Sequence, residues 1–320
     1  MWRRVGAVRA WLATIAAMPT AHRQPLTTPA ASDADPRAGR DHPVISLTTD
    51  FGARDPSAAI CTGVILTIAP RATVIDISHE VAKFQVSDGA LLLWCALPYL
   101  PVGVHVAVVD PGVGTARLPI GVATARGDVL VGPDNGLLLP AAERLGGISA
   151  AHVLENPDYR LATVTASFHG RDIFAPAAAH LALGVALAEF GRPLDPSTLV
   201  RLDWPEPRRS PGALETGVIY VDTFGNVKLA GELADLEAAL GPLADGDRLA
   251  IAWAGAPEPG EADTASEIEA AFVETFGRVA PGQALVYVDS YGRLCLAANQ
   301  ASLAANLGLR AGQPLSLRRV

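Results

Sequence analysis

Asp110 and Arg117 are the two residues of this chain whose types and spacing best suit chemistry. They stand seven residues apart in a loop that contains Gly112 and Gly114, directly after the apolar run at 104–109. That run is typical of a buried strand, and ligands of open α/β sheets bind at the carboxyl ends of strands. Because glycines let the backbone approach a small molecule closely, we expect Asp110 and Arg117 to face a ligand.

A second carboxylate, Asp50, follows the apolar run at 44–47. An aspartate at a strand end can accept hydrogen bonds from ribose hydroxyls; the alternative is an aspartate that only forms the turn. The chain has no G-x-G-x-x-G or Walker sequence that would cradle phosphates. These observations favour a nucleoside-like ligand over NAD or ATP.

His169 is the third candidate, between a short apolar run and the start of an expected helix. Its neighbours favour a functional role, because Gly170 lets a ligand approach and Asp172 can cap the helix. A structural histidine is the alternative. For Arg171 we favour a structural ion pair.

Two turns in the second half of the chain carry polar and aromatic residues. In the first, Phe224 could stack on a base while Asn226 supplies a donor and an acceptor. The alternative is a hairpin turn with a hydrophobic plug. The second turn, around Ser290, has the same ambiguity, and Asn299 after the next strand could instead cap a helix from Ser302.

Composition and motifs exclude several classes of function. The net charge of −8 argues against binding of nucleic acid, whose partners are basic. The chain has no nucleophile elbow, no H-E-x-x-H and no metal spacing among its three cysteines, so we expect neither a metal nor another cofactor. We expect the cysteines to be buried, reduced thiols, and the protein to be cytoplasmic. From residue 41 onward no run reaches the roughly 18 apolar residues of a membrane helix.

The elements that must position these residues alternate in the first half. Strands are expected at 44–47, 73–77 and 104–109, and helices at 57–68 and 86–97, the first capped by Asp55 or Ser57. Shorter strands at 119–124 and 129–131 and helices at 137–145 and 172–183 follow. This order predicts an α/β domain with a central, mostly parallel sheet.

The length and a change of pattern predict two domains. We expect the α/β catalytic domain at 43–204, a linker at 205–213, and a small, mostly antiparallel C-terminal β-barrel domain at 214–320. The barrel strands are expected at 215–221, 227–229, 248–252, 284–288, 294–297 and 314–317, with an exposed loop at 256–266. Residues 1–40 fit a disordered extension, and an export signal within 1–20 is the alternative.

Taken together, these segments resemble the S-adenosyl-L-methionine hydroxide adenosyltransferases, which are related to the fluorinase and chlorinase enzymes. The resemblance runs from about residue 44 to 320 and rests on six segments in order. They are Thr49–Gly52 with Asp55, Asp110–Gly114 with Arg117, Pro133–Gly136, Phe168–Asp172, Asp222–Asn226 and Ser290–Gly292.

The resemblance implies that water attacks C5′ of S-adenosylmethionine, giving adenosine and L-methionine. It implies a catalytic triad of Asp110, Arg117 and His169, with Asp50 on the ribose hydroxyls. It also implies a homotrimer, with each site between the first domain of one subunit and the second domain of its neighbour. The remaining substrate contacts would come from Phe51, Asp55, Asn135, Asp222, Phe224, Asn226, Ser290 and Asn299.

Two other functions are weighed against hydrolysis. Halogenases of this type have an aromatic residue, a threonine and a serine where this chain has Asp110, Val113 and Gly170. A carboxylate there repels a halide but can accept a proton from water. Halogenases also have an arginine where Tyr291 stands, which leaves the contacts to the methionine carboxylate open. A non-catalytic sensor of S-adenosylmethionine or adenosine is the third alternative.

Overall fold

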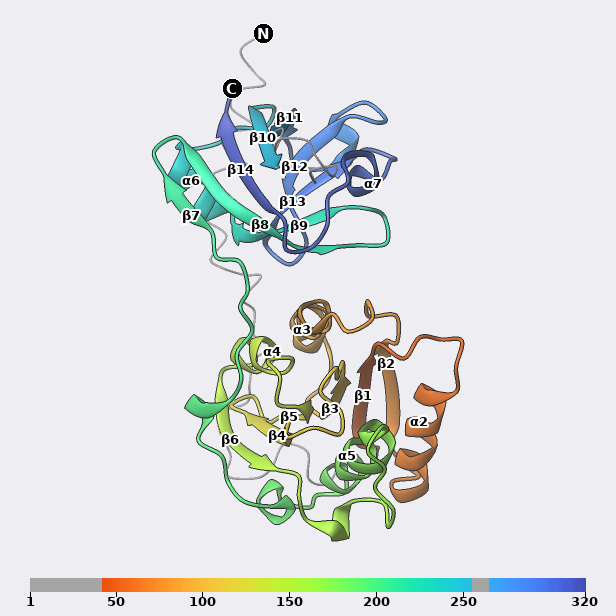
Figure 1. Ribbon diagram of the computed structural model, residues 1–320. Coiled ribbons are helices and arrows are strands. Elements are labelled where there is room, and N and C mark those ends of the chain that lie inside the picture. Colours follow the sequence, from red (N-terminus) through yellow and green to blue (C-terminus); the bar gives the residue numbers. More distant parts are fainter. Residues whose placement is uncertain (1–41, 255–264) are drawn as a thin grey trace. The chain divides into compact units, whose positions relative to one another are not determined.

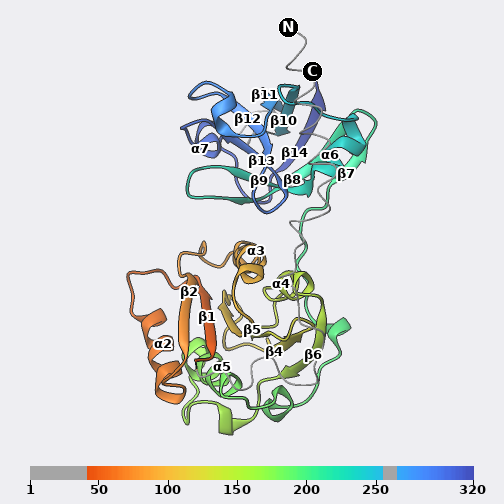
Figure 2. The ribbon, with the colours of Figure 1, turned by 180° about the vertical axis from the view of Figure 1, so that it is seen from behind.

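A computed structural model describes residues 42–254 and 265–320, which form an N-terminal part and a C-terminal part (Figures 1 and 2), each with a large hydrophobic cluster. The expected extension at 1–40, with its alternative export signal, lies outside the described residues. No helix in the described part of the chain is long and apolar enough to cross a membrane.

The N-terminal domain is built on a six-stranded sheet in the order β2-β1-β3-β5-β4-β6. Its strands are β1 (Val44–Thr49), β2 (Thr73–Ser78), β3 (Val104–Val108), β4 (Pro119–Thr124), β5 (Val129–Pro133) and β6 (Ile148–Val153). The pairs among β2, β1, β3 and β5 are parallel, and β4 pairs antiparallel with both β5 and β6. The predicted α/β domain with a mostly parallel sheet is therefore confirmed.

Helices cover both faces of this sheet (Figure 1). Helices α2 (Ser57–Ile68) and α5 (Ala175–Ala182) pack on one face, and α3 (Val86–Ala96) and α4 (Leu139–Arg144) on the other. The prediction that Asp55 or Ser57 caps α2 is wrong, because Pro56 occupies the cap position and no side chain bonds there. A fixed proline φ suits a helix start without a capping side chain.

A buried polar network ties β1 and β3 to the start of β5. His105 is hydrogen-bonded at both ring nitrogens. Its Nδ1 lies 2.8 Å from the Ser46 hydroxyl oxygen, and its Nε2 donates to Asp128 Oδ1 at 3.0 Å; all three residues are fully buried. Arg126 donates to both Asp128 oxygens, at 2.7 and 2.9 Å. Burial works to raise the pKa of Asp128, but hydrogen bonds from His105 and Arg126 outweigh it and lower that pKa to about 2.

The C-terminal domain is a β-barrel. Its strands are β7 (Arg208–Ser210), β8 (Ala213–Val221), β9 (Val227–Glu232), β10 (Arg248–Ala254), β11 (Ala265–Phe272), β12 (Ala284–Val288), β13 (Arg293–Ala298) and β14 (Pro314–Arg319). The order β14-β10-β11-β12-β13-β9-β8 closes through the β14–β8 pairing, while β7 extends β8. Only β11–β12 is parallel among these pairs, so the predicted, mostly antiparallel barrel is confirmed.

Several elements differ from the expectation. Strand β11 begins at Ala265, inside the expected loop at 256–266, whose residues up to 264 lie outside the described part. Strand β7 and helix α6 (Leu233–Leu240) were not expected, nor was β6. The start of α6 carries a reciprocal capping box between Glu232 and Asp235, a signal that the sequence did contain.

Short elements complete the fold. They are α7 (Leu303–Leu307), the π-helical turn η4 (Gly170–Phe174), and the 3-10 turns η2 (Leu97–Tyr99), η3 (Pro157–Tyr159), η5 (Leu187–Phe190), η6 (Pro196–Thr198) and η7 (Phe276–Arg278). The helix expected at 172–183 is thus a π-helical turn that continues into α5.

Candidate active site

The fold brings Asp110, Arg117 and His169 into one hydrogen-bonded cluster. Arg117 Nε donates to Asp110 Oδ1 at 3.1 Å, and Arg117 Nη2 donates to Asp110 Oδ2. The same Nη2 lies 3.0 Å from His169 Nδ1. The Asp110 and Arg117 side chains are only 4% and 6% exposed, so this bidentate pair is shielded from bulk water.

Gly114 explains how two segments so distant in sequence meet. Its φ is +76°, and a Cβ added there would lie 2.4 Å from the Ala166 carbonyl oxygen. Only glycine permits both this conformation and this close approach. The loop after β3 therefore packs directly against the segment that leads to His169.

The cluster fixes the protonation of His169. A guanidinium only donates, so Nδ1 must accept from Arg117 and the neutral ring carries its proton on Nε2. Burial, and then the charge of Arg117, lower the pKa of His169 below its usual value of 6.5. Arg117 Nη1 is buried and has no hydrogen-bond partner among the described residues.

Asp172 and Arg171 hold the backbone next to His169. Asp172 Oδ2 accepts from the Thr165 amide (2.8 Å) and hydroxyl (2.7 Å), while Oδ1 accepts from Arg171 Nε (2.6 Å). The predicted ion pair of Arg171 is present, but the predicted helix cap is wrong. Asp172 lies inside the η4 turn and bonds to the preceding loop instead.

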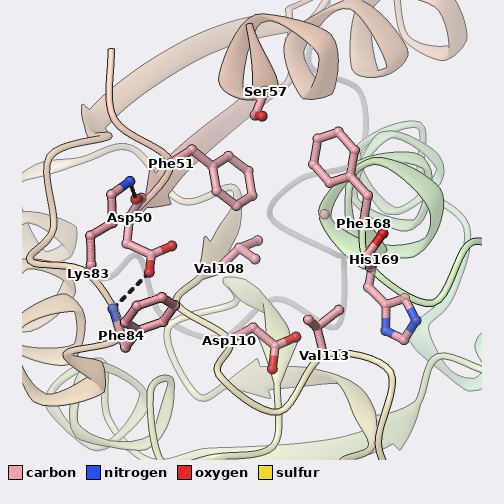
Figure 3. A pocket seen from close by; sticks show the side chains of 12 residues that line it. Asp50, Phe51, Ser57, Lys83, Phe84, Val108, Asp110, Val113, Phe168 and His169 are labelled. Carbon is pink, nitrogen blue, oxygen red and sulfur yellow. Dashed lines mark hydrogen bonds between the residues drawn. The ribbon is translucent and has the colours of Figure 1, made fainter. Parts of the chain in front are cut away.

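Asp110 and His169 border a cavity of about 390 Å³ at the carboxyl ends of β1 and β3 (Figure 3). Its polar lining comes from Asp50, Ser57, Lys83, Asp110, Ser167 and His169. Its apolar lining comes from Phe51, Phe84, Val108, Val113, Phe168 and Gly170. In Figure 3, Asp50 and Lys83 lie on one side of the cavity and Phe168 and His169 on the other.

Asp50 and Phe51 lie in this cavity, as the sequence predicts, but Asp55 and Asn135 do not line it. Asp50 is 9% exposed, and its Oδ2 accepts from the Phe84 amide at 3.0 Å. Asp55 is exposed to solvent. Asn135 donates to the Val109 carbonyl at 2.9 Å, so it supports the chain just before Asp110.

In the C-terminal domain, Asp222 organises the β8–β9 turn. Its carboxylate accepts from the amides of Phe224 and Asn226 and from Asn226 Nδ2, all at 2.9 Å. Phe224 is nevertheless 77% exposed. The hydrophobic-plug interpretation is therefore wrong, since the turn presents the ring to solvent.

Ser290 and Asn299 lie at opposite ends of strand β13, the first before its start and the second after its end. Ser290 is exposed in the turn between β12 and β13, at the start of β13. Asn299 lies beyond the other end of β13 and donates to the Val279 carbonyl at 2.8 Å. Ser302 caps α7 with its own side chain, so the alternative role of Asn299 as a cap is wrong.

Both domains match those of one known protein family. The sequence profile of the SAM hydroxide adenosyltransferase N-terminal domain matches residues 45–191, and that of the C-terminal domain matches residues 216–316. The chain belongs to this family. Every residue that lines the cavity falls within the N-terminal match, at 45–191.

Relatives of this adenosyltransferase include both hydrolases and halogenases. An "(R)-S-adenosyl-L-methionine hydrolase" of Salinispora tropica is 47% identical over 273 residues, 85% of this chain and 97% of the relative. A "Fluorinase" of an Actinoplanes species is 29% identical, over 87% of this chain and 98% of the relative. The crystal structure of an uncharacterized conserved protein from Thermotoga maritima matches with a TM-score of 0.77 at 32% identity, covering 86% of this chain and all of that one.

Several residues that line the cavity were not predicted as site residues from the sequence. Ser57 was weighed only as a helix cap, and Lys83 and Phe84 were not singled out. A signal for the latter two existed, because they follow β2, whose carboxyl end lies at the same sheet edge as that of β1. Among the described residues there is no group of three or more histidine, cysteine or acidic side chains that could hold a metal.

Proposed function

We propose that this enzyme hydrolyses the (R) epimer of S-adenosylmethionine to adenosine and L-methionine, by attack of water on C5′, in the cavity beside Asp110. The assignment of the epimer follows the name of the hydrolase relatives. The observation that carries the proposal is the buried Asp110–Arg117 ion pair, whose arginine contacts His169. Asp110 and His169 line a cavity that Asp50 also lines.

The chemistry needs a better nucleophile and not an acid. The sulfonium already activates C5′, and the thioether leaves as a neutral group. Water is a poor nucleophile, so the site must hold one water in line with the C5′–S bond and accept a proton from it. Positioning can supply at most about 7–11 kcal/mol, and a proton acceptor contributes about 10²–10⁴-fold.

The hydrogen bonds of the cluster suggest how the work is divided. His169 Nδ1 already accepts from Arg117, so the neutral ring can only donate, through Nε2–H, to the water oxygen. Asp110 keeps free lone pairs on both oxygens and is the group that accepts the proton. The charge of Arg117 stabilises the hydroxide as it forms, and Arg117 Nη1 is a further donor without a protein partner among the described residues.

The same arrangement disfavours a halogenase. Arg117 balances the charge of Asp110, so net charge alone would not exclude a halide. A carboxylate oxygen beside the nucleophile position still favours water, because water can donate a hydrogen bond to it and a halide cannot. The sensor alternative is disfavoured because Arg117 is hydrogen-bonded to both Asp110 and His169, which assembles the groups that hydrolysis needs.

We further propose that the enzyme is a homotrimer whose second domain completes the site of a neighbouring subunit. The 77% exposed ring of Phe224, on a turn stiffened by Asp222, suits stacking on a base presented by another molecule. Asn226 and Ser290 would add polar contacts. Light scattering on the purified protein tests the trimer.

Product analysis in ¹⁸O-labelled water tests the reaction. Label in the adenosine 5′-hydroxyl, with none in methionine, is the expected result. Unlabelled adenosine would rule out attack of water at C5′, and 5′-chloro-5′-deoxyadenosine formed in chloride would support the halogenase. Tight binding of substrate without any product over hours would support the sensor.

A further inference from the structure

The segment from His79 to Phe84, directly after β2, is bonded along its length to the residues around Asp50. The His79 carbonyl accepts from the Gly52 amide at 2.7 Å, and Glu80 Oε1 accepts from the Ala53 amide at 2.6 Å. The Val81 amide donates to the Thr49 carbonyl at 3.3 Å. We call residues 79–84 the clamp segment.

The last two residues of the clamp segment bond to Asp50 itself. The Lys83 ammonium donates to the Asp50 carbonyl oxygen, and the Phe84 amide donates to Asp50 Oδ2 at 3.0 Å (Figure 3). Phe84 has a φ of +65°, an unfavourable conformation for a residue with a side chain. Such a conformation persists only where its surroundings enforce it, and here it directs the amide at the carboxylate.

Lys83 stands out because it combines three properties. It lines the cavity, its side chain reaches back to the main chain of Asp50, and it forms no ion pair with a carboxylate among the described residues. A lysine head group is a compact, strongly hydrated point charge, and here it donates to one main-chain carbonyl beside the cavity and not to a carboxylate. A structural role in the core is also excluded, because Lys83 is exposed.

We propose that Lys83 is a positioning residue for ribose recognition, which holds Asp50 so that its free carboxylate oxygen meets the ribose hydroxyls. The inference rests on the proposed function, in which Asp50 accepts those hydroxyls. With main chain and carboxylate both held, Asp50 has one orientation at the cavity wall. Without Lys83, Asp50 keeps its charge but loses the orientation that two simultaneous hydrogen bonds require.

The test compares two nucleosides as competitive inhibitors, adenosine and 2′,3′-dideoxyadenosine, which differ only in the hydroxyls that Asp50 would bind. The proteins are the full-length wild type, Lys83→Met, Lys83→Arg and Arg54→Met. Arg54 is an exposed cation in the loop after Asp50, so its removal is the matched control for charge. For the wild type we expect adenosine to bind about 10- to 100-fold tighter, the range for hydrogen bonds to a charged group.

Lys83→Met is expected to reduce this ratio to about threefold or less and to raise KM about tenfold, with kcat within about threefold of the wild type. Lys83→Arg, which retains a donor, is expected to recover most of the ratio, and Arg54→Met to keep it. An unchanged ratio in Lys83→Met overturns the inference but leaves the proposed function intact. If the wild type itself does not distinguish the two nucleosides, the ribose contact of Asp50 and the inference both fall.

Discussion

Replacing Asp110 with asparagine separates the chemistry of the cluster from its stability. The substitution keeps the shape of the side chain and removes its charge, so the proton acceptor is lost. We expect kcat to fall by about 10²–10⁴-fold. The substrate KM should stay within about threefold, because Asp50 and not Asp110 holds the ribose in the proposed site.

The stability effect follows from the burial of the partner. Arg117 is 6% exposed, and removal of one member of a buried ion pair costs about 3–5 kcal/mol. The asparagine oxygen still accepts one hydrogen bond, so we expect the lower end, about 3 kcal/mol. For a domain of this size that corresponds to a Tm lower by about 6–12 °C.

The assay is adenosine release measured by chromatography at a temperature well below both melting points, with circular dichroism as the check on folding. The double variant Asp110→Asn/Arg117→Met removes the uncompensated charge, so it should regain at least half of the lost Tm and none of the activity. Glu143→Gln breaks an ion pair in which both side chains are more than half exposed, and serves as the control with unchanged kcat. The reasoning is refuted if Asp110→Asn keeps more than a tenth of wild-type kcat, or if the double variant regains activity together with stability.

Three further outcomes are expected. The lowered pKa of His169 favours its neutral ring at pH 7, so the acid decline of kcat/KM should set in at lower pH than a histidine with the usual pKa of 6.5 would give; a His169→Gln variant should lack that decline. Asp128, whose pKa is lowered from 3.8 to about 2, contributes roughly 2 kcal/mol of stability above pH 4 that is lost as the pH falls toward 2. Denaturant titrations of Asp128→Asn should therefore show a lower free energy of unfolding at pH 7 than the wild type. They should also show a smaller fall of that free energy between pH 4 and pH 2, and a fall equal to that of the wild type would contradict this. Gly225→Ala should lower Tm more than Gly246→Ala, because both have positive φ but only at Gly225 does the added Cβ meet another residue, 1.9 Å from Ser302 Oγ; equal losses would show that backbone strain alone matters.

The strand-end positions were predictable because local pattern determines them. An apolar run followed by a polar, glycine-containing loop predicts a strand that ends at a ligand, and Asp50 and Asp110 both line the cavity. Asn135 and Asp222 have the same polar character in sequence. Asn135, however, donates to the Val109 carbonyl, and Asp222 accepts from amides of its own turn. Residue type alone does not tell a ligand contact from a turn, because the same donors and acceptors serve both.

The sequence by itself determined the alternation of strands and helices in the first part, the change to a mostly antiparallel β pattern in the second, and the presence of Asp110 and Arg117 in one loop. These follow from periodicity and short spacing, which act within a few residues. Only the tertiary structure decided that Arg117 reaches His169, 52 residues later, and that Lys83 holds Asp50. Such contacts depend on which strands become neighbours and on close approaches such as that of Gly114 to Ala166, and a protonation state like that of His169 is set by its partner in space, not by its neighbours in sequence.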